Sequence, residues 1–176
     1  PGNVYLSIVH RLDRPVGGAI VFAKTSKAAS RLSDQLRRRA IDRTYLAVVR
    51  GHVRQKKGRL INHLWKDEAK NIVSVVNEGK KGAKKAILQY EVLQRKDDLS
   101  LLQVQLETGR PHQIRVQLQA LGHPLYGDQK YGQKVNRVGQ QIALWASELS
   151  LEHPTRKEII RIQSLPPKQY PWTLWV

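Results

Sequence analysis

Hydrophobic and polar positions alternate along most of the chain, and the period of the alternation changes from segment to segment. Apolar, β-rich runs at residues 4–9 and 18–23 (VYLSIV and GAIVFA) predict two strands, the first of them buried. Residues 25–40 switch to helical spacing, with Thr25 or Ser26 as the N-terminal cap. The apolar face of this predicted helix consists of Ala28, Leu32, Leu36 and Ala40.

The middle of the chain predicts strands separated by basic loops. Residues 44–50 (TYLAVVR) return to strand character, and residues 86–95 and 99–107 alternate well enough for two more strands joined by a turn. The segment from His52 to Lys85 is looser, and its stretches QKKGR and EGKKGAKK predict solvated loops.

The last third of the chain begins with a second helical pattern. Residues 112–122 (HQIRVQLQALG) predict a helix that directs Ile114, Leu118 and Leu121 inward and ends at Gly122. A turn-rich loop follows it. The elements predicted after that loop are strands near 141–151 and 158–163 and an ordered tail with aromatic anchors at 166–172 (PPKQYPW).

These elements predict an α+β fold with a mixed, mostly antiparallel β-sheet and a few flanking helices. A chain of 176 residues buries about 70% of its unfolded surface, which is enough for one hydrophobic core. We therefore expect residues 1–176 to form one domain. The chain has no cysteine, which excludes disulfides and thiolate metal sites, and no apolar run approaches the length of a membrane span.

The charge of the chain indicates the class of its partner. Thirty-one Lys and Arg against fourteen Asp and Glu give a net charge of +17. Such an excess favours a polyanionic partner, and nucleic acid ranks above an acidic membrane surface because no basic amphipathic helix dominates. The residues expected to contact an RNA backbone are Arg14, Lys80, Lys81, Lys84 and Lys85.

Two charged turns are candidates for chemistry. HRLDRPVGG (10–18) places Asp13 after the first predicted strand, and ETGRPHQIR (107–115) joins a strand to the second helix. Taken alone, Asp13 is also explained as a turn residue with local ion pairs. If the two turns are neighbours, Arg110 or Arg115 can keep this carboxylate charged, as a nucleophile or base requires.

Four blocks occur in order along the chain: HRLDRPVGG, RTYLAVVRG, ETGRPHQIRVQLQALGHPLYGDQKYG and ALWASELSLEHP. They resemble the signature blocks of the RluA-type family of RNA pseudouridine synthases, and the similarity extends from His10 to about Pro167. The resemblance implies isomerisation of uridine to pseudouridine in structured RNA, with rRNA favoured over tRNA. It implies no metal and no other cofactor.

The resemblance also assigns roles to individual residues. Asp13 matches the catalytic aspartate, Tyr45 the tyrosine that stacks on the flipped uracil, and Arg115 the basic residue that pairs with the aspartate. Arg11 resembles the arginine that replaces the flipped base in the RNA stack, and Leu144 the apolar residue of the base pocket. Arg110 and His112, in the third block, are further candidates for substrate binding.

Four departures from the family pattern change these expectations. Val16 stands where a threonine or serine is common, and Pro111 stands where a threonine is common. Trp145 replaces a frequent histidine beside Leu144, so the rim of the pocket is expected to differ. Proline is tolerated at the start of a helix. Only nine residues precede His10, whereas family domains have further strands there, so we expect the N-terminal part of the catalytic domain to be missing from this chain.

Two other functions compete with the synthase. A non-catalytic RNA-binding relative or assembly factor would use the same fold and basic loops. A glycosidic-bond hydrolase generally needs two carboxylates that flank the bond, and only Asp13 has an obvious position. We expect a monomer in the cytoplasm, or in an organellar matrix if the source is a eukaryote.

Overall fold

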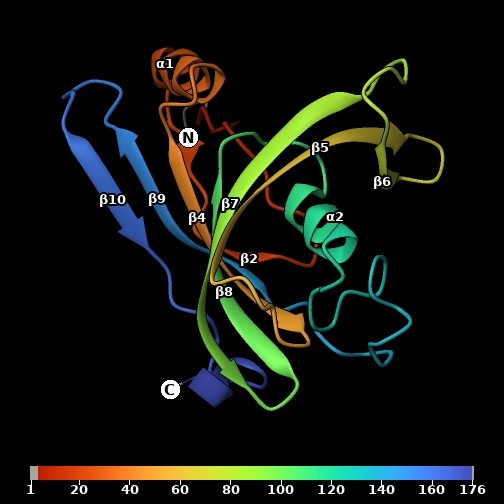
Figure 1. Cartoon of the computed structure of the whole chain (residues 1–176). Coiled ribbons are helices and arrows are strands. Elements are labelled where there is room, and N and C mark those ends of the chain that lie inside the picture. Colours follow the sequence, from red (N-terminus) through yellow and green to blue (C-terminus); the bar gives the residue numbers. More distant parts are fainter. Residues whose placement is uncertain (1–3, 176) are drawn as a thin grey trace.

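The long strands of the chain form one curved sheet in the order β10–β9–β4–β8–β7–β5–β6, which places β4 and β8 near its centre (Figure 1). A computed structural model describes residues 4–175. Its strands are β1 (Ser7–Ile8), β2 (Gly17–Gly18), β3 (Phe22–Ala23), β4 (Asp42–Arg50), β5 (Lys57–Asp67), β6 (Ile72–Val76), β7 (Lys84–Lys96), β8 (Leu99–Leu106), β9 (Leu144–Glu152) and β10 (Ile159–Gln163). Its helices are α1 (Ser26–Arg37), α2 (Gln113–Ala120) and the 3-10 helix η1 (Trp172–Trp175). All long neighbours pair antiparallel, which confirms the predicted α+β class.

Both faces of β4 are covered, which explains the continuous apolar run of its sequence. Tyr45, Ala47 and Val49 belong to one core cluster, which also contains Ile114 and Leu118 of α2. Alternate residues on the other face pack in a second cluster that includes the buried ring of the tail residue Trp172. The C-terminal tail is therefore anchored by an aromatic residue, as predicted.

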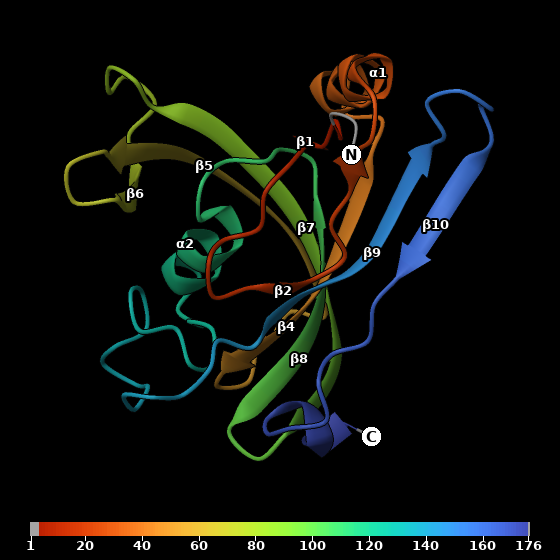
Figure 2. The same ribbon diagram turned by 180° about the vertical axis from the view of Figure 1, so that it is seen from behind.

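A short parallel pair ties the N-terminal part of the chain to strand β9 of the sheet (Figure 2). In β2, Gly17 pairs with Trp145 of β9, and Gly18 pairs with Ala146. Gly18 has φ +120°, and a Cβ there would lie 2.3 Å from the carbonyl oxygen of Ala146. Only glycine fits this close approach of two backbones, so these two residues fix the turn that carries Asp13.

The two predicted helices form with shorter boundaries. Thr25 caps α1 by accepting the N–H of Ala28 at 3.1 Å, but the helix ends at Arg37, and Ala40 is exposed outside it. Helix α2 begins one residue later than expected and ends before Gly122, whose φ of +91° is typical of a glycine after a helix.

The interior face of α2 is wider than its hydrophobic pattern indicated. Ile114 and Leu118 are buried as predicted, whereas Leu121 is only half-buried. The polar residues Gln113, Arg115 and Gln117 are buried as well. The helix therefore directs polar groups as well as apolar ones into the protein.

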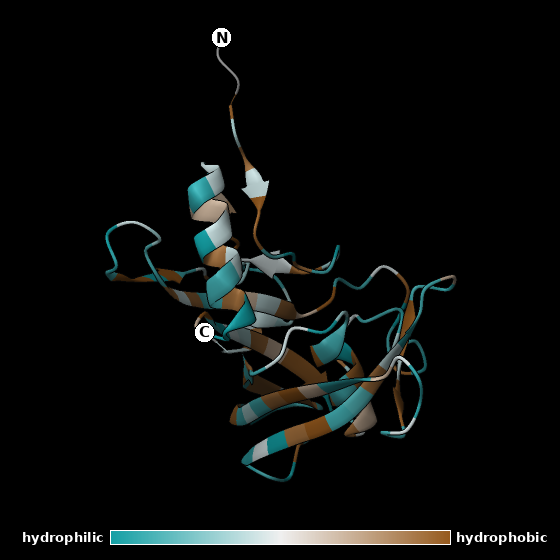
Figure 3. Ribbon diagram, turned by 90° about the horizontal axis from the view of Figure 1, so that it is seen from above, coloured by the Kyte–Doolittle hydropathy of each residue, from teal (hydrophilic) through white to brown (hydrophobic). Residues whose placement is uncertain are grey.

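The first predicted strand is wrong in its extent and burial. Of residues 4–9 only Ser7–Ile8 is a strand, and the apolar side chains of this segment are largely exposed: Val4 is 88%, Leu6 65% and Ile8 60% exposed. Figure 3 shows this segment extending beside α1. Residues 18–23 are also not one strand, because Ile20 separates β2 from β3 and is itself exposed.

The loose segment before Lys85 was also wrongly predicted, because most of it is the β5–β6 hairpin. QKKGR lies across the start of β5 rather than in a loop, and EGKKGAKK forms the connection into β7. Between residues 4 and 175, no helix has both the length and the apolar character that a membrane span requires.

Candidate active site

Four elements bring the predicted catalytic residues together in a pocket of about 90 Å³. Asp13 comes from the turn before β2, Tyr45 from β4, Arg115 from α2, and Leu144 from the start of β9. The turn is closed by a hydrogen bond from the N–H of Val16 to the carbonyl of Asp13 at 2.8 Å. Residues separated by more than a hundred positions in sequence therefore line one pocket.

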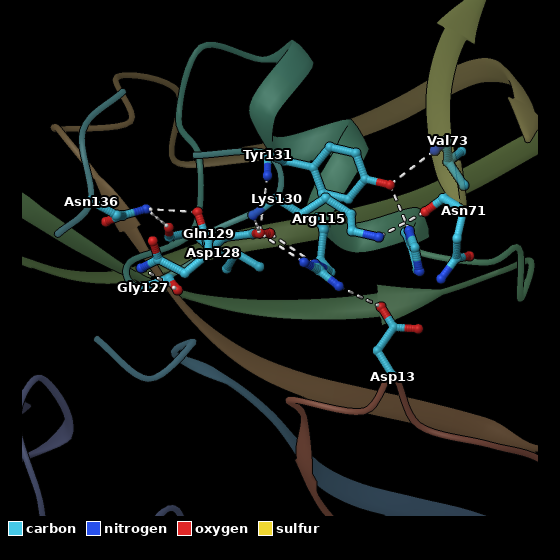
Figure 4. Close-up of polar contacts among 12 residues, drawn as sticks. Asp13, Asn71, Val73, Arg115, Gly127, Asp128, Gln129, Lys130, Tyr131 and Asn136 are labelled. Carbon is cyan, nitrogen blue, oxygen red and sulfur yellow. Dashed lines mark hydrogen bonds and ion pairs between the residues drawn. The ribbon is translucent and has the colours of Figure 1, made fainter. Parts of the chain in front are cut away.

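Arg115 lies between two carboxylates (Figure 4). Its Nη1 lies 3.4 Å from Oδ2 of Asp13, while its Nε and Nη2 donate to Oδ2 and Oδ1 of Asp128 at 2.8 and 2.7 Å. The side chain of Asp13 is 26% exposed, whereas that of Asp128 is fully buried. The partner of Asp13 is thus Arg115. Arg110, the other candidate, donates its Nε to the carbonyl of Lys85.

Asp128 was not singled out from the sequence, although it lies in a quoted block. Burial opposes its charged form, but hydrogen bonds and the charge of Arg115, together with the N–H groups of Lys130 and Tyr131, hold the pKa of Asp128 below its usual value. Burial also opposes the charge of Arg115, and the two carboxylates overcome it and raise the pKa of the guanidinium. Arg115 and Asp128 therefore both stay charged at neutral pH. In the sequence, the only indication of Asp128 is that it is the one carboxylate in the turn-rich loop HPLYGDQKYG.

The imidazole of His112 contacts Tyr131 rather than Asp13. The oxygen of the Tyr131 hydroxyl accepts the N–H of Val73 at 2.9 Å and lies 2.5 Å from Nδ1 of His112. We therefore assign the hydroxyl of Tyr131 as the donor and Nδ1 of His112 as the acceptor of this hydrogen bond. Burial, helped by nearby cations such as Arg115 and opposed by Asp13, lowers the pKa of His112. His112 still lines the pocket, as a neutral ring at neutral pH.

Tyr45 and Leu144 form the apolar side of the pocket. They are 7% and 4% exposed, and both belong to the main core cluster. Burial raises the pKa of Tyr45 above its usual value, so the phenol keeps its proton at neutral pH. Trp145 does not line the pocket, because its indole packs over Gly17 and donates to Ser164 at 3.1 Å.

The pocket opens into a larger cleft of about 750 Å³ with a strongly positive lining. Its two carboxylates are Asp13 and Glu107, and Glu107 is already bound by both Nε and Nη2 of Arg59 at 2.8 Å. Arg59 therefore lowers the pKa of Glu107 to about 2. The cations that line the cleft are Arg11, Arg14, Arg37, Arg39, Arg43, Lys66 and Arg110.

The predicted backbone-binding residues divide between two regions. Arg14 lines the cleft, as does the exposed Arg11. Lys80, Lys81, Lys84 and Lys85 lie outside that lining, on the β6–β7 connection and the start of β7. Lys80 covers the ring of Trp65 at 4.4 Å. Within the described part of the chain, no cluster of three His, Asp or Glu side chains could hold a metal ion.

The chain belongs to the RNA pseudouridylate synthase family. The profile of this family matches residues 1–120, which include the turn with Asp13, the strand with Tyr45 and the helix with Arg115. The predicted membership of the RluA-type family is thereby confirmed.

Curated relatives agree with this assignment. The chain is 40% identical over 154 residues to the uncharacterized RNA pseudouridine synthase YhcT of Bacillus subtilis, covering 86% of this chain and 50% of the relative. It is 34% identical over 176 residues to ribosomal large subunit pseudouridine synthase C of Salmonella typhimurium, covering 93% of this chain and 54% of that protein. The chain thus spans about half the length of these curated relatives.

Two human structures have the same fold. Human RNA Pseudouridylate Synthase Domain Containing 1 superposes with a TM-score of 0.78 at 26% identity, covering 94% of this chain and 71% of that chain. Human RNA Pseudouridylate Synthase Domain Containing 4 gives a TM-score of 0.79 at 22% identity, covering 96% and 74%, which shows the likeness of fold alone.

Proposed function

We propose that the protein isomerises uridine to pseudouridine in structured RNA. In this reaction the bond from N1 to C1′ breaks, the uracil turns within the pocket, and C5 bonds to C1′. The proton on C5 is then lost, and N1 gains a proton, so the product is an isomer of the substrate. The observation that carries the proposal is the convergence of Asp13, held by Arg115, with Tyr45 and Leu144 in one pocket.

Asp13 is the group that acts on the ribose. Its carboxylate either adds to C1′ or removes a proton from C2′, and either step releases the uracil from C1′. Arg115 supplies a positive charge 3.4 Å away and orients the carboxylate, because its other two nitrogens are fixed by Asp128. A fixed nucleophile gains rate by proximity to the reacting atom.

The pocket holds the uracil while it is detached. A target base inside stacked RNA must first be flipped out, which costs a few kcal/mol. The ring of Tyr45 stacks on the base, and Leu144 closes the apolar side. The phenol of Tyr45 relays the C5 proton, because its oxygen accepts this proton while its own hydroxyl proton passes to solvent. Arg11, exposed at the rim shared by pocket and cleft, fills the space that the base leaves.

Ribosomal RNA is the substrate that the observations favour over tRNA. The positive cleft fits a folded RNA, and the relative from Salmonella typhimurium is named as a synthase of the ribosomal large subunit. The protein needs no cofactor for this chemistry, since the reaction neither oxidises nor reduces the base.

The test uses the whole chain, an Asp13→Asn variant and an Asp98→Asn control, whose carboxylate lies on an exposed turn away from the pocket. Each is incubated with unmodified transcripts of large-subunit rRNA and of tRNA, and pseudouridine is mapped by chemical labelling. We expect modification by the wild type and by Asp98→Asn, at defined rRNA positions, and none by Asp13→Asn. Circular dichroism checks that the inactive variant is folded.

Other outcomes would identify the competing functions. RNA binding without modification by any of the three proteins would indicate a non-catalytic RNA-binding relative. Release of free uracil would indicate a hydrolase, although Asp13 is the only carboxylate among the described residues that line the inner pocket. Modification of tRNA alone would overturn the preference for rRNA.

A further inference from the structure

Arg43 occupies the boundary between the inner pocket and the outer cleft. It lies on β4 two residues before Tyr45, so both side chains leave the strand on the same face. Its guanidinium lines the pocket and the cleft at once. A substrate that enters the pocket from the cleft must pass this side chain.

The guanidinium of Arg43 lacks the partners that buried charges normally have. Its Nε is fully buried without a hydrogen bond, and none of the described residues forms an ion pair with it. Burial lowers the pKa of Arg43, and the cause that opposes this effect is the phenol of Tyr45 rather than a carboxylate. By contrast, Arg115 contacts two carboxylates. An unpaired, partly buried cation is costly unless a partner arrives from outside the chain.

The groups around Arg43 cannot supply that partner. His10 accepts the N–H of Val21 through Nε2 at 3.2 Å, and burial together with the charge of Arg43 lowers its pKa, so the ring is neutral. Tyr45 keeps its phenolic proton. Glu107, the other carboxylate of the cleft lining besides Asp13, is bound by Arg59.

Gly109 makes room for the guanidinium in this position. A Cβ at residue 109 would lie 2.5 Å from Nη1 of Arg43. The backbone of Gly109 does not have a positive φ, so the turn itself does not demand glycine there. The absence of a side chain at residue 109 therefore serves the placement of Arg43 at the mouth of the pocket.

We propose that Arg43 binds a phosphodiester group of the RNA beside the uridine that occupies the pocket. This inference rests on the proposed function and adds a specific anion contact to it. A phosphate matches the planar fork of a guanidinium and forms charge-assisted hydrogen bonds with it. The uracil carbonyls are neutral acceptors and would leave the charge of Arg43 without compensation.

The first test observes the Nε–H of Arg43 by NMR in the wild-type chain, with Arg43→Gln used to assign the signal. The probes are a five-nucleotide uridine RNA, inorganic phosphate and the nucleoside uridine. We expect a downfield shift with the RNA, a smaller one with phosphate, and none with uridine. A shift with uridine alone would assign Arg43 to the base, and no shift with the RNA would exclude any contact.

The second test measures the salt dependence of RNA binding. Loss of one phosphate contact to single-stranded RNA should make the slope of log K against log salt about 0.7 shallower in Arg43→Gln. Arg161→Gln removes the same charge from an exposed position on β10 and should keep the wild-type slope. Gly109→Ala should weaken binding without removing a charge, because it displaces the guanidinium.

The stability of the variant separates a binding role from a structural one. Because Arg43 has no partner in the fold, Arg43→Gln should unfold at the wild-type temperature or above, whereas a structural arginine would lower it. If the wild type forms no pseudouridine but its Arg43 signal responds to RNA, the phosphate site stands and the proposed function fails. If the wild type forms pseudouridine and Arg43→Gln keeps its salt slope, the phosphate site fails alone.

Discussion

Asp128, a fully buried carboxylate, holds two of the three guanidinium nitrogens of Arg115 and leaves the third directed at Asp13. The backbone N–H groups of Lys130 and Tyr131 donate to the same carboxylate at 2.9 and 3.1 Å, so Asp128 is itself fixed by its own turn. Under the proposed function Asp128 is therefore a positioning residue, because it is fully buried and acts on Asp13 only through Arg115.

Asp128→Asn is expected to impair turnover more than RNA binding. The amide nitrogen of asparagine would face an N–H of Arg115, so the guanidinium would shift and Asp13 would lose its fixed orientation. A misplacement of about 1 Å costs roughly 10²-fold in rate. The free energy of unfolding should fall by about 3 kcal/mol, since a buried cation loses part of its partner. Single-turnover kinetics and urea unfolding measure the two effects.

The control for this variant is Asp34→Asn, which makes the same change at an exposed residue of α1 paired with Arg37 and Arg38. Its stability should change far less than that of Asp128→Asn, because ion pairs at the surface contribute little, and its turnover should not change. If Asp128→Asn turns over substrate as fast as the wild type, Asp128 has only a structural role.

Tyr45→Phe separates the ring of the tyrosine from its hydroxyl. The phenyl ring keeps the stacking surface, so RNA affinity should stay within about twofold, while loss of the proton-transfer group should lower turnover by about 10²-fold or more. Tyr90→Phe is the matched control, because Tyr90 is buried in the same core cluster but does not line the pocket. If Tyr45→Phe turns over substrate as fast as the wild type, Tyr45 contributes only by stacking on the base.

Salt dependence distinguishes the cleft from the lysine-rich connection as the RNA surface. If the protein neutralises about 5 phosphates, the slope of log K against log salt should lie near −3.5 to −4.5. Arg39→Gln, in the cleft, should make the slope shallower by about 0.7 to 0.9. Lys84→Gln tests the other surface in the same way. If the slope changes in Lys84→Gln and not in Arg39→Gln, the RNA binds at the β6–β7 connection.

Gly18→Ala should destabilise the protein and displace Asp13. The added methyl group would lie 2.3 Å from a backbone oxygen of Ala146, which cannot move without disturbing β9, and φ at this residue is +120°. Strain of this kind costs about 1–3 kcal/mol. Gly79→Ala is the control, since nothing lies within 4 Å of its added Cβ. Thermal unfolding and pseudouridine formation should both be impaired only in Gly18→Ala.

Acidification should destabilise the protein through His112. Burial is the main cause that lowers the pKa of this imidazole in the folded state, so the unfolded chain takes up the proton at a higher pH than the native protein does. The free energy of unfolding is therefore highest above pH 6.5 and falls as the pH drops from there towards the lowered native pKa. Urea unfolding between pH 5 and 7.5 should show this loss.

His112→Gln removes the titrating group and should reduce the acid loss of stability. A remainder is expected from His10, whose pKa burial also lowers. If the free energy of unfolding falls equally with acidification in the variant and the wild type, His112 does not contribute.

Sequence pattern predicted the central strands and both helices because their periodicity reflects burial. In β4, Tyr45, Ala47 and Val49 face one core, and the next residues face another, so the segment reads as continuously apolar. The same reasoning failed for residues 4–9. An apolar run shows that burial would be favourable, but it does not show whether another part of the fold packs against it. It also failed for β5. Few side chains of this long strand are fully buried, so its sequence, which includes several basic residues, shows no clear alternation of apolar and polar positions.

The candidate site was predictable where the chemistry lies in a motif and not where it depends on tertiary contacts. Asp13, Tyr45 and Arg115 were assigned by resemblance, and the structure brings them together. Arg43 and Asp128 lie in the same motifs, yet their roles depend on burial, which spacing along the chain does not reveal.

The two-residue pairing of β2 with β9 also has a consequence for biosynthesis. The turn that bears the reactive aspartate is synthesised well before the strand that anchors it, which begins at Leu144. Because a chain is synthesised from its N-terminus, this turn must wait for β9 before it can take up its native position. A nascent chain that ends before Leu144 therefore cannot hold the carboxylate in place.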